Sequence, residues 1–234
     1  MVSEDLRRII SRITSRARIL GVGAESVLLV AKINNYKIIL KFRKMKPYMD
    51  PELAKSLTIL RTIKESKIIA IINKNRIPSP RILFSLPKTG LIGMEYIEGT
   101  TLKEALEREL VDPRTAGRVA GEIIGRVHSI GIVHGDPTTS NYIVKNNNYY
   151  LIDYGLSEFS DRLEDRAVDI HLFRRATLAT HAKYAGILIE SFLDGYRAAL
   201  GEPADKVIER ASKLELMGRY VAERRTVWSK QNYS

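Results

Sequence analysis

Residues 134–155 read HGDPTTSNYIVKNNNYYLIDYG, and this stretch decides the fold that the rest of the chain predicts. His134, Asp136 and Asn141 follow the pattern H-x-D-x-x-x-x-N, and Asp153 opens an Asp-Tyr-Gly triplet. Two short apolar runs flank three consecutive asparagines between them, which predicts a β-hairpin. A hairpin would bring Asn141 and Asp153 close in space. The combined pattern is typical of phosphoryl transfer from a nucleoside triphosphate.

Each of these residue types suits that chemistry. One carboxylate must orient or deprotonate the attacking hydroxyl or water, and Asp136 is the candidate. Mg²⁺ prefers hard oxygen ligands, which Asn141 and Asp153 would supply. Aspartate and asparagine are also ordinary turn formers, so the interpretation rests on the whole pattern and not on any one residue. We therefore expect ATP and Mg²⁺ as cofactors.

The first half of the chain predicts a small antiparallel sheet with a helical segment laid on it. Strands are expected at 18–21, 26–33, 36–42, 82–86 and 91–96, and one or two helices at 51–72. The apolar side of the helical segment is expected to hold Leu53, Leu57, Leu60, Ile63 and Ile68.

After Glu98-Gly99 the pattern becomes mainly helical, apart from the hairpin. Helices are expected at 102–109, 114–129, 165–180, 185–200 and 204–225. The fold class is therefore α+β, with a strand-rich lobe followed by a helical lobe. A ligand site is expected where two such lobes meet.

The strand-rich lobe also offers residues for a nucleotide. Gly21 and Gly23 lie between the first two expected strands, where glycine lets the backbone approach a phosphate, although the turn itself could require glycine. Lys41 ends the third strand and is a candidate for the α/β-phosphates. Glu65, inside the expected helix, is the candidate partner of Lys41. The alternative for Glu65 is a surface ion pair with neighbouring lysines.

Composition limits the class of protein. The chain has 38 Lys and Arg against 27 Asp and Glu, a formal charge of +11, which favours polyanions without choosing among them. It has no cysteine, which excludes a disulfide-stapled secreted scaffold and favours the cytoplasm. No apolar run approaches the roughly 20 residues that span a bilayer, and no signal-peptide pattern opens the chain, so membrane spanning and secretion are not expected.

Several short sequence strings indicate which family the chain resembles. They are GAES at 23–26, RTIKES at 61–66, MEYIEG at 94–99, HGDPTTSN at 134–141 and EDRAVDI at 164–170. With these strings the chain, from about Gly21 to about Arg225, resembles the small atypical kinase of the KEOPS complex, the PRPK-type family related to the RIO kinases.

The resemblance implies a bilobal, protein-kinase-like fold. Residues 1–97 would form the N-lobe, a nucleotide-binding sheet and helix preceded by an extra N-terminal helix. Residues 98–234 would form a reduced helical C-lobe with the catalytic loop, the metal-binding hairpin and a basic C-terminal tail. The basic helix at the N-terminus would pack one apolar face on the body, or bind RNA or a membrane.

The resemblance also implies a role for each candidate residue. Lys41 would bind the α/β-phosphates and Glu65 would hold Lys41, close to the loop of Gly21 and Gly23. Met94 would be the gatekeeper, and the backbone of Glu95 and Ile97 would bind the adenine edge. Asp136 would be the catalytic base or water-orienting group, and Asn141 and Asp153 would bind Mg²⁺.

The implied activity is that of an ATPase or serine/threonine kinase in the threonylcarbamoyl modification of tRNA adenosine. The implied partners are the metal-binding transferase subunit of the complex, a small subunit that binds the N-lobe, and tRNA through the basic tail 218–234. The alternative for the tail is a frayed terminus.

Three positions depart from the usual patterns. Gly135 replaces the arginine of regulated kinases, Pro137 replaces a leucine beside the catalytic aspartate, and Tyr154 replaces a phenylalanine. Only 9 residues separate Gly155 from Glu164, which leaves no room for a long activation loop. Two rivals stay open: a small-molecule phosphotransferase of the aminoglycoside-kinase type, and a non-catalytic RNA-binding or scaffold pseudokinase.

Overall fold

The computed structural model describes residues 17–33, 35–44 and 48–216. The chain divides into two compact units, Met1–Glu98 and Gly99–Ser234. The helix expected at the N-terminus and the basic tail lie outside the described residues.

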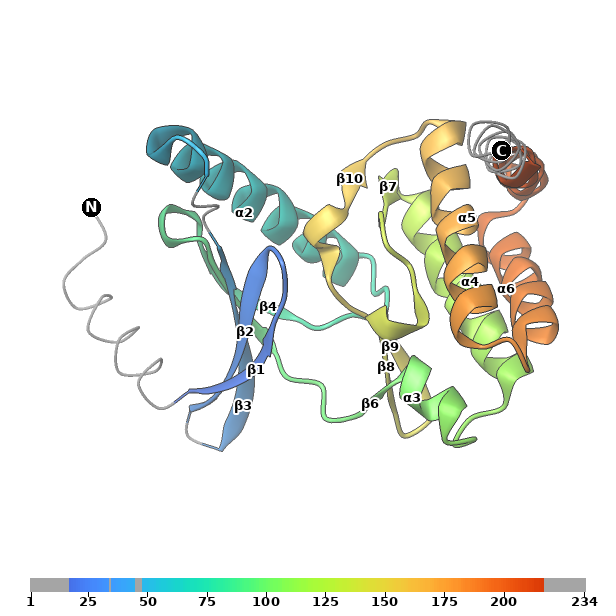
Figure 1. Cartoon of the computed structure of the whole chain (residues 1–234), viewed down its shortest axis with the longest axis horizontal. Helices are drawn as coiled ribbons and strands as arrows, with labels where there is room; N and C mark the ends of the chain where they lie inside the picture. Colours follow the sequence, from blue (N-terminus) through green and yellow to red (C-terminus); the bar gives the residue numbers. More distant parts are fainter. Residues whose placement is uncertain (1–16, 34, 45–47, 217–234) are drawn as a thin grey trace, which may run out of the picture. The chain divides into compact units, whose positions relative to one another are not determined.

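The first unit is a five-stranded antiparallel sheet with one long helix, as the sequence predicts (Figure 1). The strands lie in the order β1-β2-β3-β5-β4, which places β3 at the centre. Their bounds are β1 Arg18–Val22, β2 Ser26–Ile33, β3 Tyr36–Arg43, β4 Ile82–Leu86 and β5 Leu91–Glu95, with a 3-10 turn, η1, at Pro87–Thr89. Ala31, Ile38, Leu40 and Leu91 form a buried core on this sheet. The strands are rich in Val, Ile and Leu, which pack well on a pleated surface.

The helix of this unit, α2, is a single helix that spans Pro51–Lys74. It begins after Asp50, whose side chain accepts hydrogen bonds from the backbone N–H groups of Glu52 and Leu53. Proline at the first helical position needs no hydrogen-bond partner for its nitrogen and has a suitable φ. The local sequence therefore specifies where the helix starts.

The buried side of α2 differs from the predicted one. Leu53, Leu60 and Ile63 were expected inside but are 53%, 62% and 46% exposed, whereas Ile68 is buried. The helix buries Ala54, Thr62, Glu65, Ile68, Ile69 and Ile72. Apolar residues lie all around this helix, so their spacing marks no single face. The carboxylate of Glu65 turns inward to the cations of β3, and this contact decides which side of α2 is buried.

The second unit is mainly helical and contains two small sheets. Its helices are α3 Leu102–Glu107, α4 Pro113–Ser129, α5 Leu163–Thr180 and α6 Ala185–Leu200, and residues 204–216 are also helical. One sheet joins β6 Thr100–Thr101, β8 Tyr142–Lys145 and β9 Asn148–Leu151, and the other pairs β7 Ile132–Val133 with β10 Glu158–Phe159. The four predicted helices between 102 and 200 are confirmed, with ends that differ by at most two residues. The two-residue strands were not predicted, because they are too short to show a period.

The predicted hairpin is confirmed as β8 and β9. Its turn consists of Asn146 and Asn147, at φ 48° and 62°, and Asn148 already pairs with Lys145. Asparagine tolerates this left-handed backbone, which is why the asparagine run makes the turn. Within the described residues, no helix combines the length and the apolar character needed to cross a membrane.

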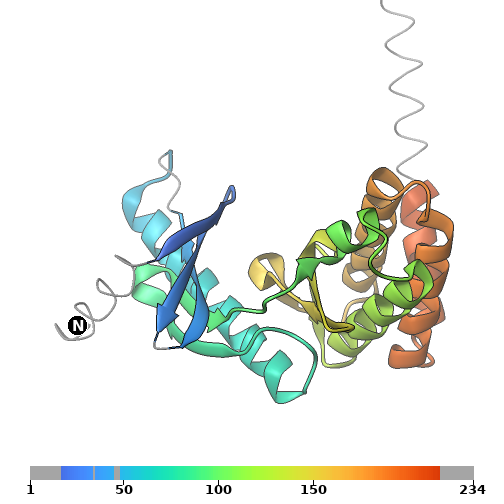
Figure 2. The same cartoon turned by 90° about the horizontal axis from the view of Figure 1, so that it is seen from below.

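Helices α4 and α6 lie side by side, as both Figure 1 and Figure 2 show. Glycines make this close approach possible. A Cβ atom added to Gly121 would lie 1.9 Å from the carbonyl oxygen of Phe192, and one added to Gly195 would lie 2.0 Å from that of Arg118. Both distances are far below a van der Waals contact, so the two helix backbones touch directly. This contact supports the segment that follows α4, which carries the HGD sequence.

We predict that Gly121→Ala lowers the free energy of unfolding by about 1–3 kcal/mol or more, because the methyl group forces the two helices apart. Gly186→Ala is the matched control on α6, since an added Cβ there meets no described atom within 4 Å. That control is expected to be neutral or stabilising by about 0.5–1 kcal/mol. Urea unfolding of both variants measures the difference, and equal stabilities would contradict the close contact.

Candidate functional site

The candidate residues lie in two groups, one in each unit. In the first unit, Lys41 on β3 is buried, and its Nζ lies 2.6 Å from Oε1 of Glu65 on α2. The structure thus brings together the two residues that the sequence paired. Glu65 is 1% exposed, so it is not a surface ion pair.

Glu65 binds a second cation as well. Its Oε2 accepts a hydrogen bond from Nη2 of Arg43 at 2.5 Å. Arg43 and Lys41 lie two positions apart on β3 and therefore point to the same face of the sheet. One buried carboxylate holds both side chains, which fixes the Lys41 ammonium in place. Sequence reasoning missed Arg43 as a member of this group, although its spacing from Lys41 was a usable signal.

Gly21 lies inside β1, opposite Leu28 of β2, and Gly23 lies in the connection between these strands, where its N–H donates to the carbonyl of Ser26 at 2.9 Å. Among the described residues, a Cβ added to Gly21 would meet nothing within 4 Å, and one added to Gly23 would meet only the Ser26 oxygen at 3.6 Å. Neither glycine has a positive φ. The turn therefore does not require glycine at either position, which weakens the purely conformational explanation.

Met94 and Glu95 end β5, and Ile97 follows it; all three are partly buried. The carboxylate of Glu95 accepts from Nε of Arg81 at 3.1 Å. The backbone N–H and C=O groups of Ile97 make no hydrogen bond with another described residue. Such groups need a partner, which leaves them for water or a ligand.

In the second unit, the side chains of Asp136 and Asn141 are joined. Nδ2 of Asn141 donates to the carbonyl oxygen of Asp136 at 2.8 Å and to its Oδ2 at 2.9 Å. Because the amide nitrogen faces two acceptors, the amide oxygen Oδ1 of Asn141 points elsewhere. The carbonyl of Asn141 accepts from the N–H of Ile152 at 2.9 Å, which places Asn141 beside the residue before Asp153.

Pro137 is accommodated in this loop. The N–H of Thr138 donates to the carbonyl of Asp136 at 2.8 Å, so Pro137 is the central residue of a three-residue turn. An inverse γ-turn needs φ near −75° at its centre, close to the value that the proline ring imposes. Pro137 is also buried. The substitution therefore fits the loop without breaking it.

Asp153 is exposed and has a positive φ of 62°, which aspartate tolerates better than most residues. Its Oδ1 accepts from the N–H of Gly155 at 3.1 Å. The next residue, Tyr154, is buried, and its hydroxyl donates to the carbonyl of Leu151 at 3.3 Å. The hydroxyl that distinguishes Tyr154 from phenylalanine thus has a partner.

The HGD loop is held from behind by Asp169 of α5, which is 1% exposed. Its carboxylate accepts from the backbone N–H groups of His134 at 2.6 Å and Gly135 at 2.8 Å. It also accepts from Nε2 of His128 at 3.0 Å, and Nδ1 of His128 lies 2.8 Å from the hydroxyl of Tyr196. Burial raises the pKa of Tyr196, so the hydroxyl keeps its proton. This network connects α4, α5 and α6 to the loop.

Sequence reasoning missed Asp169, although the string EDRAVDI had been singled out. The available signal was a charged residue at helical spacing with Phe173 and Thr177, which are buried on α5. A carboxylate on the buried face of a helix requires donors, and the nearest backbone turned out to be that of the HGD loop.

Glycine at position 135 has a structural reason. Its φ is +84°, and an added Cβ would lie 2.6 Å from the carbonyl oxygen of Leu156. An arginine would be strained here on both counts. The backbone conformation at position 135 therefore favours glycine, and arginine could not take its place without strain.

His134 is buried and neutral. Its Nε2 donates to the carbonyl of Ile152 at 3.1 Å, so Nδ1 is free to accept the N–H of Asp136 at 3.3 Å. Burial lowers the pKa of His134 below its ordinary value, and this outweighs the nearby carboxylates, of which Asp169 is the strongest. The ring thus bridges the loop and the strand end that precedes Asp153.

Comparison with known proteins identifies the family. The chain is 38% identical over 211 residues to the KEOPS complex subunit Bud32 of Pyrococcus abyssi, which covers 87% of this chain and 96% of the relative. The chain belongs to the Bud32 family. The resemblance seen in the sequence is thereby confirmed, and the motifs that carry it lie in the residues described above.

Bud32-type chains also match parts of longer proteins. A probable bifunctional tRNA threonylcarbamoyladenosine biosynthesis protein of Methanococcus vannielii is 32% identical over 203 residues, covering 87% of this chain but 36% of that protein. A family model described as an ABC1 atypical kinase-like domain matches residues 63–177.

A solved structure confirms the predicted kinase-like fold. The Rio2 kinase of Chaetomium thermophilum, in its ADP/Mg²⁺-phosphoaspartate complex, superposes with a TM-score of 0.62 over 91% of this chain and 75% of that chain. Its sequence identity to this Bud32-family chain is 14%, so the likeness concerns the fold.

We predict that Asp169→Asn destabilises the protein by about 1–3 kcal/mol. The amide keeps the size of the carboxylate but turns a donor towards buried N–H groups. Asp194→Asn is the matched control on α6, because Asp194 is exposed. Urea unfolding should separate the two variants, and wild-type stability of Asp169→Asn would show that the loop does not depend on this carboxylate.

A second prediction concerns pH. Because the pKa of His134 is lowered in the folded protein, the unfolded chain binds an extra proton below its ordinary pKa of about 6.5, and stability falls as the pH drops through that value. His134→Gln removes this contribution. Melting temperatures at about pH 7.5 and about pH 5.5 should therefore differ less in His134→Gln than in the wild type. An unchanged difference would contradict the neutral, buried ring.

Proposed function

We propose that this Bud32-family chain is an ATP- and Mg²⁺-dependent kinase or ATPase that acts as a subunit of a KEOPS complex in the threonylcarbamoyladenosine modification of tRNA. The names of its relatives support both the complex and the tRNA modification. The observation that carries the enzymatic part is the Asp136–Asn141 pair, hydrogen-bonded in the pattern that phosphoryl transfer requires.

In this proposal the first unit, residues 1–97 as an N-lobe, binds the nucleotide. Lys41 would bind the α/β-phosphates, because Glu65 already holds its ammonium in a fixed position. The backbone at Gly21 and Gly23 would approach the phosphates, in keeping with glycines that the turn does not need. Met94 would border the base as gatekeeper, and the backbone of Glu95 and Ile97 would bind its edge.

The second unit, residues 98–234 as a C-lobe, supplies the catalytic groups. Asp136 would orient the attacking hydroxyl or water and accept its proton. One of its oxygens, Oδ2, is held by Asn141, and the other is left for the nucleophile. This arrangement fixes the carboxylate before any substrate arrives.

The donor set of this unit fits Mg²⁺. Asn141 uses its amide nitrogen on Asp136, so its hard amide oxygen is the atom left for a cation. The exposed carboxylate of Asp153 is a second hard oxygen ligand, which matches the few protein ligands that Mg²⁺ takes beside a nucleotide. When bound, Mg²⁺ would neutralise charge on the transferred phosphoryl group.

The proposal includes partners and a location. The partners are the transferase subunit of the complex, a small subunit that binds the first unit, and tRNA through the basic tail 218–234. A chain without cysteine is compatible with the cytoplasm, where we expect it to act.

The two rival functions have less support. The small-molecule phosphotransferase has less support because the relatives named above are a KEOPS complex subunit and a tRNA threonylcarbamoyladenosine biosynthesis protein. A non-catalytic scaffold is expected to lose Lys41, Asp136 or Asp153, and all three are present.

Phosphate release from Mg–ATP tests the proposal. Asp153→Asn and Asp136→Asn are each expected to lower turnover by about 10²–10⁴-fold, because one removes a charge from the metal site and the other removes the base. Each protein is assayed alone and with the transferase subunit and tRNA. The control is Asp205→Asn, since Asp205 is 77% exposed and pairs only with the surface residue Arg197.

Turnover that survives Asp153→Asn, or no turnover in any mixture, contradicts the enzymatic role. A normal rate for Asp205→Asn alongside two inactive variants supports it.

A further inference from the structure

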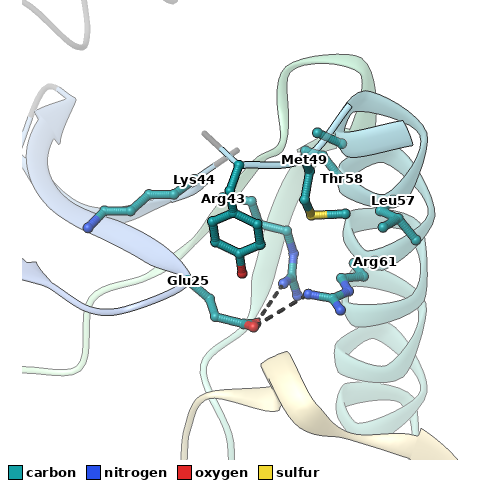
Figure 3. A pocket seen from close by; sticks show the side chains of 9 residues that line it. Glu25, Arg43, Lys44, Met49, Leu57, Thr58 and Arg61 are labelled. Carbon is teal, nitrogen blue, oxygen red and sulfur yellow. Dashed lines mark hydrogen bonds and ion pairs between the residues drawn. The ribbon is translucent and has the colours of Figure 1, made fainter. Parts of the chain in front are cut away.

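A pocket of about 100 Å³ opens in the first unit between the end of β3 and the first half of α2 (Figure 3). Its charged lining consists of Glu25, Arg43, Lys44 and Arg61. Arg43 touches the candidate site through Glu65, and Lys44 touches it through the carbonyl of Gly23. We call it the Arg43–Arg61 pocket. Its volume is that of about three water molecules, which is room for one phosphate-sized group.

Arg43 brings buried donors to this pocket that are not all used. Its side chain is 5% exposed. Nη2 is bound to Glu65, but Nη1 lies 3.9 Å from Oε2 of Glu25, and Nε has no hydrogen-bond partner among the described residues. Guanidinium N–H groups that are taken out of water cost free energy unless they find an acceptor. A small acceptor entering the pocket would reduce that cost.

Arg61 faces the same place from α2. Its Nη1 lies 3.5 Å from Oε1 of Glu25, so Glu25 stands between two guanidinium groups. Figure 3 shows both arginines converging on this carboxylate. Charge-assisted hydrogen bonds normally measure about 2.7–2.9 Å, so Glu25 reaches neither arginine at full strength. Its position between the two guanidinium groups marks a place that suits an anion.

We propose that the Arg43–Arg61 pocket binds the phosphoryl oxyanion of a small phosphomonoester, which displaces the carboxylate of Glu25 and is held by Arg43 and Arg61. The Arg61 guanidinium presents a fork of parallel N–H donors that matches two oxygens of a phosphate, and Arg43, whose Nη2 is held by Glu65, adds Nη1. A phosphoryl group has three terminal oxygens and can accept from both guanidinium groups at once.

Charge and shape favour this ligand. Three cations and one carboxylate line the pocket, a net charge of +2, and a phosphomonoester carries about −1.5 to −2 at pH 7. Lys44 adds to the field and not to the contact, because its Nζ donates to the carbonyl of Gly23 at 2.8 Å.

The remaining wall selects for an organic phosphate. Met49, Ala54 and Leu57 line it and give the carbon side of the ester an apolar surface. We therefore expect a phosphomonoester with an apolar carbon group, such as phenyl phosphate, to bind more tightly than inorganic phosphate.

Titration of the full chain with phenyl phosphate and with inorganic phosphate at low salt, followed by calorimetry, tests the site. Each titration is run without and with a saturating Mg–nucleotide analogue, which fills any phosphate site shared with the nucleotide. Saturable binding with one site per chain is expected. Arg61→Gln should weaken it about ten-fold or more, because a charged fork is lost. Glu25→Gln should strengthen it several-fold, because the competing carboxylate is gone.

Two controls separate a built site from a general effect of charge. Lys32→Gln on β2 and Glu52→Gln on α2 change the net charge in the same two directions at exposed positions outside the pocket. Both should leave the affinity unchanged. Arg61 is 46% exposed, so its loss should not unfold the protein, and a thermal melt checks this.

The proposal is overturned by any of three results: no saturable binding, loss of binding when the nucleotide analogue is present, or equal effects of Arg61→Gln and Lys32→Gln. None of these readouts uses ATP turnover. The phosphate-binding proposal can therefore fail while the proposed enzymatic function holds, and the reverse is also true.

Discussion

The contact of Glu65 with Lys41 and Arg43 is the interaction on which the first unit depends. A buried carboxylate is several kcal/mol too costly unless charges or N–H groups surround it. Here two cations of one strand meet one carboxylate of the helix at 2.6 and 2.5 Å. This requirement turns the Glu65 side of α2 inward and leaves Leu53 and Leu60 exposed. The need of the Glu65 carboxylate for cationic partners, more than apolar periodicity, sets which side of α2 is buried.

The second unit meets the same requirement with backbone N–H groups and a histidine ring. Asp169 is satisfied by two backbone N–H groups of the HGD loop and by His128. A side chain on α5 thereby fixes the backbone just before Asp136, and the close contact of α4 with α6 holds Tyr196 against His128. In both units a residue proposed for catalysis is held from behind by a buried carboxylate. Preorganisation of this kind removes reorganisation from the reaction step.

Much of the fold and of the site could be predicted from the sequence. The strands of the first unit, the hairpin and four helices of the second unit came from local periods and turn residues, which reflect short-range physics. The pairing of Lys41 with Glu65 could be predicted from the expected strand and helix. The hairpin places Asn141 beside Ile152, next to Asp153, as expected, whereas the hydrogen bonds from Asn141 to Asp136 came only from the structure. Strands of two residues lay beyond this reasoning, since they carry no period of their own.

The sequence by itself determined the order of the elements, the places where they begin and end, and the residue types that meet at the HGD loop, because these depend on neighbours along the chain. Only the tertiary structure decided which face of α2 is buried, that Asp169 secures the loop, and that Arg61 and Arg43 converge on Glu25. These contacts join residues that are 18 to 41 positions apart. Such contacts form only when packing brings distant segments together, and the demand of each buried polar group for a partner then selects among the possible arrangements.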